Sequence, residues 1–546
     1  MRIYCNPLNL PYKYQHFVHH GLDTGSREAA DPSLILFKGR YYLFLSMTAG
    51  FLVSDDLADW EFHPYLGPIP IYDYAPDVIA RGEWMYFCAS RNGENCSFFR
   101  SRDPIHEPFE EIPGSFPFWD PHQFLDDDGR LYFYWGCSDQ RPIYGTELDP
   151  QTLHPLRDPA ELIFSHTDRI GYERNGDDHT KPNVAPWMEG PWMIKHDGLY
   201  YLHYAAPGTE CNVYCDAVYI SDKPLGPFTL AKNNPLSLQP GGFVTGAGHG
   251  STLKDREGRY WHVASMRISR NHMFERRIGL WRSGFDSDGN LWCDQRYGDW
   301  PRCVDDEPWQ DPRWMLLSYA KPIRASSGAQ AELAVNEDIR SWWSADTSAP
   351  GQWIEVDLTA VRDVRAIQIN FADEAPPIPE GTVRDIDQRE MFTRWLLEGS
   401  LDGKSYFPIE DKRSAMTDLP HDLIILEEGL PCRYLRLTVT ELPYGQAARI
   451  SGMRVFGLAN APKPGRISAS ADRLGPMDMR VHWYAENATG VCIQWGFAPD
   501  KLYHSYMVYG RQEQFIGSLV AGQEIYLRVD AFNEGGVTRG SLLHLL

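Results

Sequence analysis

Five ionisable side chains stand ahead of five similar segments of the sequence. They are Asp31 in "AADPSL", Asp77 in "APDV", Asp120 in "FWDPHQF", Glu189 in "MEGPW" and His249 in "GAGHGS". Hydrolysis of an acetal needs a carboxylic acid that protonates the leaving oxygen and a second carboxylate that activates water or attacks the anomeric carbon. A third charge nearby raises the pKa of the acid above about 4.3 and keeps it protonated near neutral pH. Gathered in one place, these side chains suit that chemistry.

A strand–turn–strand repeat follows each of these residues and predicts how they come together. The segments are "KGRYYLFLS", "RGEWMYFCAS", "DGRLYFYWG", "DGLYYLHYA" and "EGRYWHVAS", and each joins a short apolar run to an aromatic, β-rich run through a turn glycine. The glycines are Gly39, Gly82, Gly129, Gly198 and Gly258, at spacings of 43, 47, 69 and 60 residues. Five such units, with almost no helical periodicity between them, predict a five-bladed β-propeller.

The propeller fold is expected to bring the ionisable residues to one mouth of its axis. The first strand of each blade is innermost, and all the first strands run the same way along the axis. The five residues stand five to nine positions before the turn glycines, at the start of these strands. A single Asp-Pro is an ordinary turn starter. Four carboxylates and a histidine at equivalent positions crowd one another, and such crowding indicates chemistry or a bound cation.

The order of these motifs resembles glycoside hydrolase family 43. "ADPSL", "APDV", "DPHQFLDDDG", "EGPWMIKHDGLYYL" and "GHGS" carry the resemblance over about residues 28–300, and "SDDLADW" and "SDKPLGPF" resemble blade signatures of the family. The resemblance implies a five-bladed, inverting enzyme that acts on an oligo- or polysaccharide containing arabinose or xylose. It implies Asp31 as the general base, Glu189 as the general acid, and Asp120 as the residue that orients Glu189 and raises its pKa.

The resemblance also implies groups that surround the three carboxylates. Asp77 is expected to bind substrate hydroxyls near the base. His249 is expected on the axis, where many members hold a hydrated calcium ion, although the chemistry itself requires no cofactor. An arginine of the last blade usually contacts the acid side in this family, and both Arg276 and Arg277 match it.

Three aromatic residues are candidates for the wall of a sugar site. Tyr74 stands where the family commonly has a tryptophan before Ala-Pro-Asp. Trp119 precedes Asp120, and Trp187 lies two positions before Glu189. We expect these tryptophans to act as sugar platforms, with packing in the blade cores as the alternative.

The last 230 residues or so resemble two β-sandwich domains. "SSGAQAELAVNEDIRSWWSA", "QWIEVDL" and "CRYLRLTV" resemble the discoidin, or coagulation factor type C, domain. Beyond the proline-rich "NAPKPG", "MRVHWYAENATGVCIQWG" and "EIYLRVDAFNEGGVT" resemble a fibronectin type III domain. The chain is therefore predicted to be all-β, with a propeller over 1–317 and sandwiches over 318–459 and 460–546. The discoidin-like domain is expected either to bind sugar or to brace the propeller.

Charge and composition argue against a nucleic-acid-binding protein, a membrane-spanning protein and a disulfide-stabilised scaffold. Lys+Arg 52 against Asp+Glu 74 give a net charge of −22, spread along the chain, whereas nucleic acids and anionic membranes are bound by clustered Lys and Arg. The sequence has no run of eighteen apolar residues that would span a membrane. The N-terminus has no signal-peptide pattern, which predicts a cytoplasmic protein or one written without its leader. Ten cysteines are too dilute for a disulfide scaffold and are expected to be thiols. The oligomeric state is not predicted.

Several activities fit these motifs. An exo-acting α-L-arabinofuranosidase is the leading hypothesis, and a β-D-xylosidase is its closest rival, because the motifs do not separate a furanose from a pyranose. Retaining fructosidases of related propellers use an Asn-Asp-Pro-Asn-Gly nucleophile and a Glu-Cys acid, whereas this chain has "AADPS" and "EGP". A non-catalytic, lectin-like propeller is expected to lack a catalytic carboxylate, and all three are present here.

Overall fold

The structure is a computed structural model that describes residues 1–16, 25–67, 69, 74–91, 95–112, 116–374, 376 and 386–545. Within these ranges the chain is built from β-strands and three short 3₁₀ helices, η2 (Gly171–Glu173), η3 (Ala331–Val335) and η4 (Pro443–Gly445). The all-β prediction is therefore confirmed. No helix in the described part of the chain has the length and apolar character needed to cross a bilayer.

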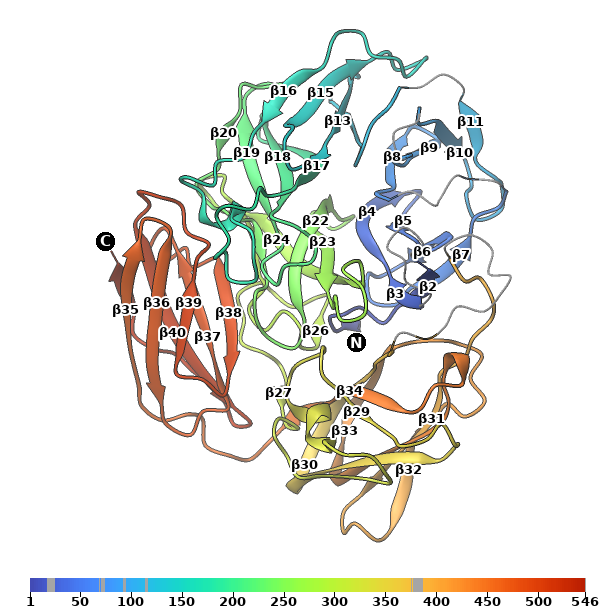
Figure 1. Ribbon diagram of the computed structural model, residues 1–546, viewed down its shortest axis with the longest axis vertical. Coiled ribbons are helices and arrows are strands. Elements are labelled where there is room, and N and C mark those ends of the chain that lie inside the picture. The colour runs from blue at the N-terminus through green and yellow to red at the C-terminus, as the bar shows by residue number, and fades with distance from the viewer. Residues whose placement is uncertain are drawn as a thin grey trace.

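Five antiparallel sheet units form the first domain, at the top of Figure 1. The first two contain β4 (Ala30–Phe37), β5 (Arg40–Ser46), β6 (Gly50–Ser54) and β7 (Glu61–Pro64), then β8 (Asp77–Arg81), β9 (Trp84–Cys88), β10 (Phe98–Ser101) and β11 (Glu110–Ile112). The third contains β12 (His122–Leu125), β13 (Leu131–Trp135), β15 (Ile143–Leu148) and β16 (Ala160–Ile163). The last two contain β17 (Met188–His196), β18 (Leu199–Ala206), β19 (Cys215–Ser221) and β20 (Thr229–Leu230), then β22 (Thr245–Lys254), β23 (Tyr260–Arg267), β24 (Arg276–Phe285) and β25 (Leu291–Cys293).

The first strands of these units close into a ring. Each of β4, β8, β12, β17 and β22 contacts the next, and β22 returns to β4. The N-terminal β1 (Ile3–Tyr4) pairs with β26 (Arg302–Cys303) beyond the last blade. Aromatic and aliphatic side chains of the first and last blades share one buried cluster, which packs the two ends of the ring together. The domain is a β-propeller of five blades.

The inner strands share a local distortion where they reach the axis. Asp31, Ala75, Asp120, Gly190 and His249 all have a positive φ, between 47° and 58°. Register shifts mark this point in β4, β17 and β22, as in a β-bulge. Such backbone is costly for residues other than glycine and persists only where surrounding contacts hold it. Asp31, Asp120 and His249, three of these five residues, line one cavity.

Side chains of the preceding blade satisfy the amides freed by the bulges. The N–H of Asp31 donates to Ser265 Oγ at 2.8 Å, that of Ala75 to Ser46 Oγ at 2.8 Å, and that of Asp120 to Ser90 Oγ at 2.9 Å. Asp216, in β19 of the fourth blade, accepts from the N–H of His249, in the last blade, at 2.7 Å. Because a buried amide without a partner is costly, these contacts fix four of the five inner strands against the preceding blade.

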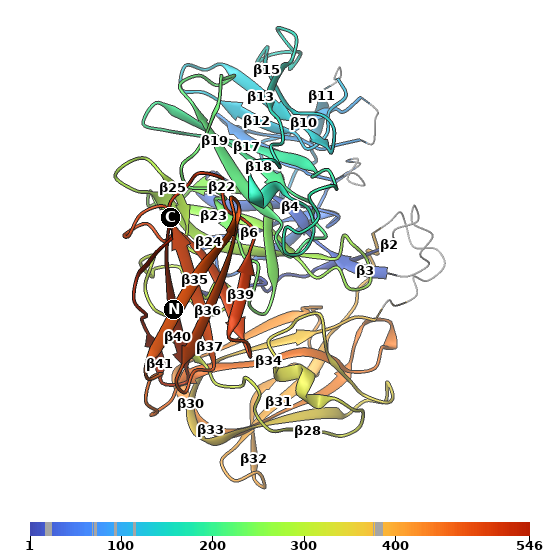
Figure 2. The same cartoon turned by 60° about the vertical axis from the view of Figure 1, so that its left-hand side comes forward.

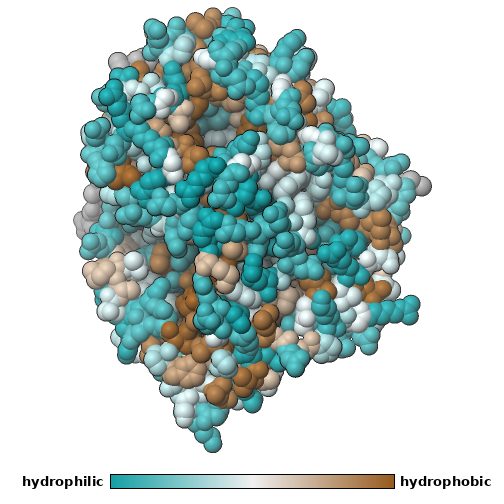
Figure 3. All heavy atoms as spheres, turned by 180° about the vertical axis from the view of Figure 1, so that it is seen from behind, coloured by the Kyte–Doolittle hydropathy of each residue, from teal (hydrophilic) through white to brown (hydrophobic). Residues whose placement is uncertain are grey.

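Two sandwiches follow the propeller, below it and at its left in Figure 1, and Figure 2 shows them in a second view. The first contains β27 (Met315–Leu316), β28 (Ile323–Ala325), β29 (Trp343–Ser344), β30 (Gln352–Phe371), β31 (Arg394–Ser400), β32 (Tyr406–Asp411), β33 (His421–Glu441) and β34 (Arg449–Leu458). The second contains β35 (Ile467–Gly475), β36 (Asp478–Ala485), β37 (Gly490–Gly496), β38 (His504–Tyr509), β39 (Glu513–Ile516), β40 (Ile525–Asn533), β41 (Gly536–Thr538) and β42 (Leu543–Leu545). The fibronectin type III assignment of the second sandwich stays a prediction. The rear face of the molecule is mainly hydrophilic, with small apolar groups (Figure 3).

A buried arginine joins the three domains. Arg454 of the first sandwich donates from Nε to Glu337 Oε1 at 2.9 Å and from Nη1 to the backbone oxygen of Asp299, in the propeller, at 2.6 Å. The hydroxyl of Tyr509, in the second sandwich, donates to Glu337 Oε2 at 3.5 Å. Arg454, Glu337 and Asp299 are all buried. Their charges stabilise the junction only as a set, because removing one leaves the others uncompensated.

Arg454→Met is therefore expected to destabilise the whole chain. It leaves Glu337 and Asp299 buried without their cation, which costs about 3–5 kcal/mol. Thermal unfolding should show a clear fall in Tm. Arg413→Met, which removes a surface partner of Asp411, should change Tm little, since exposed ion pairs contribute about 0–1 kcal/mol. Equal Tm values for the two variants would contradict the role of Arg454.

Candidate active site

A cavity of about 210 Å³ lies at the mouth where the bulged residues gather. Its wall includes Asp31, Asp120, Glu189, His249 and Arg276. Four of the five residues predicted to converge, three carboxylates and a histidine from four blades, thus meet at this cavity. What the site can do depends on which of these groups holds a proton.

Asp31 is held as a carboxylate. Its Oδ1 accepts from Arg276 Nη1 at 3.0 Å, and its Oδ2 accepts from Ser46 Oγ at 2.7 Å. Burial alone would raise the pKa of Asp31, but the charges of Arg276 and His249 and the hydrogen bond from Ser46 hold that pKa below its usual value. Asp31 is ionised at neutral pH and can accept a proton from water.

The pKa of Glu189 is shifted in the opposite direction, upward. Burial raises its pKa, and the negative charge of Asp31 adds to that rise, although His249 and Tyr214 oppose it. The Tyr214 hydroxyl donates to Oε1 of Glu189, and the Cys137 thiol donates to Oε2 at 3.4 Å. Strand β14 (Cys137–Ser138) pairs with β17, with Cys137 opposite Glu189, so the backbone fixes this contact. The glutamate is oriented and suited to hold a proton.

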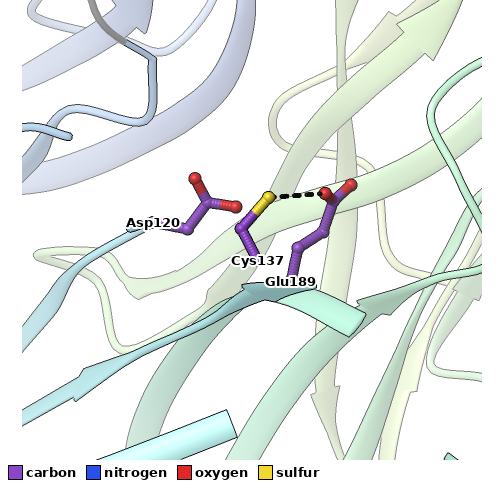
Figure 4. A group of neighbouring side chains, drawn as sticks. All are labelled: Asp120, Cys137 and Glu189. Carbon is purple, nitrogen blue, oxygen red and sulfur yellow. Dashed lines mark hydrogen bonds between the residues drawn. The ribbon is translucent and has the colours of Figure 1, made fainter. Parts of the chain in front are cut away.

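Asp120 forms a pair with Glu189 across the Cys137 thiol (Figure 4). One ligand atom of each of these three side chains lies within 4.8 Å of the other two. Burial, and then the charges of Glu189 and Asp31, raise the pKa of Asp120 to about 7, against the effect of His249. Two carboxyl groups this close do not both ionise readily, so the pair keeps a proton near neutral pH.

His249 is the cation between the base and the acid pair. Its Nδ1 lies 3.2 Å from Asp31 Oδ1 and 3.7 Å from Asp120 Oδ2. Burial lowers the pKa of the imidazole, but the charges of Asp31, Asp120 and Glu189 together raise it above its usual value. A protonated His249 therefore offsets carboxylate charge at the floor of the cavity.

Arg276, not Arg277, faces the site. Arg276 binds Asp31 and also donates from Nε to Glu28 Oε1 at 3.0 Å. Its contact is with the base Asp31, whereas the sequence predicted a contact on the acid side. Arg277 points the other way and donates from Nε to His421 Nε2 of the first sandwich at 2.7 Å. Adjacent residues of a strand face opposite sides, which separates the two arginines.

Asp77 does not line the cavity, which corrects its predicted role as a ligand of substrate hydroxyls. It is 1% exposed, and its carboxylate accepts from the backbone N–H of Gln123 at 2.9 Å and lies 3.0 Å from His122 Nδ1. The residue equivalent to Asp31 in this blade is Ala75, which has the positive φ. Asp77 stands two positions further along the strand and fastens β8 to β12.

The aromatic residues lie at the cavity as expected. Tyr74, Trp119 and Trp187 all line it, and the two tryptophans are 37% and 43% exposed, so neither is buried in a blade core. Beside the cavity is a more polar groove of about 510 Å³, which shares Glu210 and Met273 with it. Part of the insertion between Gly171 and Trp187 forms one wall of this groove.

Sequence reasoning missed three residues that touch the acid and base. Cys137 and Tyr214 hold Glu189, and Ser46 holds Asp31. The sequence contained a signal for Ser46. The segments "LFLS", "FCAS" and "HVAS" each end in a serine that accepts a hydrogen bond from a backbone N–H with positive φ. Cys137 and Tyr214 had none, since only the pairing of distant strands brings them to Glu189.

The hydrated calcium ion predicted near His249 stays a prediction, and the protein itself offers few free ligands for it there. Ca²⁺ takes six to eight oxygen ligands. His249 offers nitrogen, and Asp31 is already bound by Arg276 and Ser46. The imidazole, with its raised pKa, itself supplies positive charge at this place. We derive no chemical step through calcium.

Comparison with known proteins identifies two domain families. Residues 24–291 match "Glycosyl hydrolases family 43", and residues 319–453 match "F5/8 type C domain". The chain is 24% identical over 287 residues to a β-D-galactofuranosidase of Aspergillus niger, which covers 46% of the chain and 77% of the relative. It is 22% identical over 251 residues to a β-xylosidase of Xylanibacter ruminicola, and this match covers 37% of the chain and 77% of the relative. It is 23% identical over 328 residues to xylosidase/arabinosidase 43A of Humicola insolens, covering 48% and 95%.

Solved structures include similar chains. A thermostable family 43 glycoside hydrolase is 25% identical, with a TM-score of 0.42, over 52% of this chain and 95% of the other. The family 43 protein BlXynB of Bacillus licheniformis is 14% identical, with a TM-score of 0.43. The match covers 99% of this chain and 91% of the other.

Gly190→Ala is expected to displace His249. Gly190 has a φ of +58°, and a Cβ placed on it would lie 2.6 Å from two ring carbons of His249. The ring must then move from Asp31 and Asp120, which weakens the interactions that raise its pKa. NMR titration of the His249 ring should show a lower pKa in the variant. Gly39→Ala tests the strained backbone alone, since Gly39 also has a positive φ but open space around it. An unchanged His249 pKa in Gly190→Ala would contradict this packing.

Proposed function

Since residues 24–291 form a glycosyl hydrolase family 43 domain, we propose that the protein is an inverting, exo-acting α-L-arabinofuranosidase. The observation that carries this proposal is the small cavity with Asp31 ionised on one side and the proton-holding pair of Glu189 and Asp120 on the other. Its volume of about 210 Å³ is below the roughly 300–1,000 Å³ of pockets for drug-sized ligands. A single terminal sugar suits such a cavity.

In the proposed reaction Glu189 donates its proton to the glycosidic oxygen as the C–O bond breaks. Asp31 takes a proton from the water that attacks the anomeric carbon. Burial and the charge of Asp31 keep the pKa of Glu189 high before this step, and Asp120 is the other member of the carboxyl pair that holds the proton. Inversion requires room for the water between the two carboxyl groups, about 6.5–9.5 Å in such enzymes. NMR of the first-formed sugar should show the anomer opposite to that of the substrate.

The aromatic rim and the neighbouring groove complete the proposal. Trp119 and Trp187 present exposed ring faces on which a sugar can stack. The polar groove beyond Glu210 and Met273 lies where the rest of the glycan leaves the cavity. Its backbone amides, Asp178, Lys181 and Asn271 offer hydrogen-bond partners for hydroxyl groups.

β-D-Xylosidase activity is the second candidate. Relatives of this chain carry the names β-xylosidase and xylosidase/arabinosidase, so both sugars occur among them. Hydrolysis of aryl α-L-arabinofuranoside and aryl β-D-xyloside, measured side by side, separates the two. Faster turnover of the arabinofuranoside supports the first proposal, and faster turnover of the xyloside replaces it by the second.

Glu189→Gln and Asp31→Asn should each lower kcat by about 10²–10⁴-fold, the usual contribution of a general acid or base. Glu83→Gln is a matched control, because Glu83 is an exposed surface carboxylate paired with Lys38. It should leave kcat unchanged. Full activity in either cavity variant would refute the role assigned to that residue.

The pH dependence of kcat/KM should be bell-shaped. Activity falls at low pH as Asp31 gains a proton, and it falls above about pH 7 as the Asp120–Glu189 pair loses its proton. Arg276→Met removes the charge that holds the pKa of Asp31 down, so the acidic limb should move upward by about one pH unit or more. Arg276→Lys keeps a charge and should move it less. An acidic limb that is the same in all three proteins would show that Asp31 does not set it.

A further inference from the structure

The group formed by Asp120, Cys137 and Glu189 has a composition that the proposed hydrolysis does not require (Figure 4). A thiol stands between two carboxyl groups, and one ligand atom of each side chain lies within 4.8 Å of the others. Acid–base catalysis uses the carboxyl groups, and the thiol serves it only as a hydrogen-bond donor that orients Glu189, which does not require sulfur. Thiolate with carboxylate is instead a ligand set for a borderline-soft divalent cation.

The distances in this group approach those of a coordination shell. Zn²⁺ binds sulfur at about 2.3 Å and carboxylate oxygen at about 2.0–2.2 Å, so the two ligand atoms of a tetrahedral site lie about 3.5 Å apart. The Sγ of Cys137 lies 3.4 Å from Glu189 Oε2. One oxygen of Asp120 lies within 4.8 Å of Sγ and of an oxygen of Glu189, so Asp120 completes the shell when its side chain moves closer to them.

The site is held in place and open to solvent. Pairing of β14 with β17 sets Cys137 opposite Glu189, and Tyr214 anchors the other oxygen of Glu189. All three ligand residues line the cavity, so a cation can enter from it. Three protein ligands with a fourth position toward the cavity, filled by water, is a common arrangement for Zn²⁺.

We propose that Asp120, Cys137 and Glu189 bind Zn²⁺ or a similar thiophilic cation, and that the bound cation switches the hydrolase off. Bonds form from the metal to Sγ and to one oxygen of each carboxylate. The S–H bond of Cys137 and the carboxyl O–H bond of the pair break, and both protons go to solvent, with no change of oxidation state. Glu189 then has no proton for the leaving oxygen. Binding stands on geometry alone, whereas the inhibition rests on the proposed function.

Hard cations are expected to bind far less well. Mg²⁺ and Ca²⁺ prefer oxygen ligands and gain little from a thiolate. The site should therefore distinguish Zn²⁺ and Cd²⁺ from Ca²⁺ and Mg²⁺.

Direct binding tests the site without any substrate. Co²⁺ added to the full chain should give a thiolate-to-metal charge-transfer absorption, and calorimetry should give a one-to-one complex with Zn²⁺. Cys137→Ala should abolish the absorption and weaken Zn²⁺ binding by about 100-fold. Cys303→Ala, at a cysteine buried outside this cavity, should keep both. A wild-type chain without the charge-transfer absorption, or equal Zn²⁺ affinity in Cys137→Ala, would overturn the proposal.

Inhibition is the second measurement. Zn²⁺ should stop hydrolysis of the aryl glycoside by the wild-type chain, and a chelator should restore it, while Ca²⁺ and Mg²⁺ leave the rate unchanged. Whatever activity Cys137→Ala retains should need about 100-fold more Zn²⁺ for the same inhibition. Equal sensitivity of the two proteins would place the inhibition at another site and refute the switch. If no glycoside is hydrolysed, the proposed function fails, and the spectroscopic test still decides whether the metal site exists.

Discussion

Three carboxyl groups of the cavity wall, and a fourth that is buried outside the wall against Arg276, face two cations, and this imbalance governs the site. Glu28, Asp31, Asp120 and Glu189 face Arg276 and His249. Burial makes uncompensated charge costly, so two cations do not keep all four carboxyl groups ionised, and some of these groups retain protons near neutral pH. Arg276 and His249 lie against Asp31, which stays ionised. The pKa of Asp120 and that of Glu28 both rise to about 7. One arrangement of charges thus provides a base and a reservoir of protons.

The accessory domain helps to keep this arrangement. The segment that precedes Arg276 carries Met273 and Phe274 into the cavity wall. Asn271 of this segment donates to the backbone oxygen of Asp373, in the F5/8 type C domain, at 2.9 Å. Arg277 and His421 meet directly behind Arg276. Of the two roles expected for this domain, sugar binding and bracing, these contacts support bracing.

Local sequence patterns were sufficient to predict much of the fold and part of the active site. Each glycine turn between aromatic runs forms a hairpin within a few residues, and five of them in succession leave few alternatives to a ring of blades. Asp31, Asp120 and Glu189 could be located because the fold carries the starts of its inner strands to one place. Asp77 was misplaced because it stands five residues before its turn glycine, while the other four residues stand eight or nine before theirs. Ala75, seven residues before Gly82, fits that spacing better.

The sequence by itself determined the blades, the order of the domains and the three carboxylates, since these follow from short-range patterns. Only the tertiary structure decided between Arg276 and Arg277, because the choice depends on which face of β24 turns to the cavity. Only it brought Cys137 and Tyr214 to Glu189, and Arg454 to Asp299, across 52, 25 and 155 positions of sequence. Which groups hold protons also belongs to the tertiary structure, because a pKa depends on burial and on charges from several blades at once.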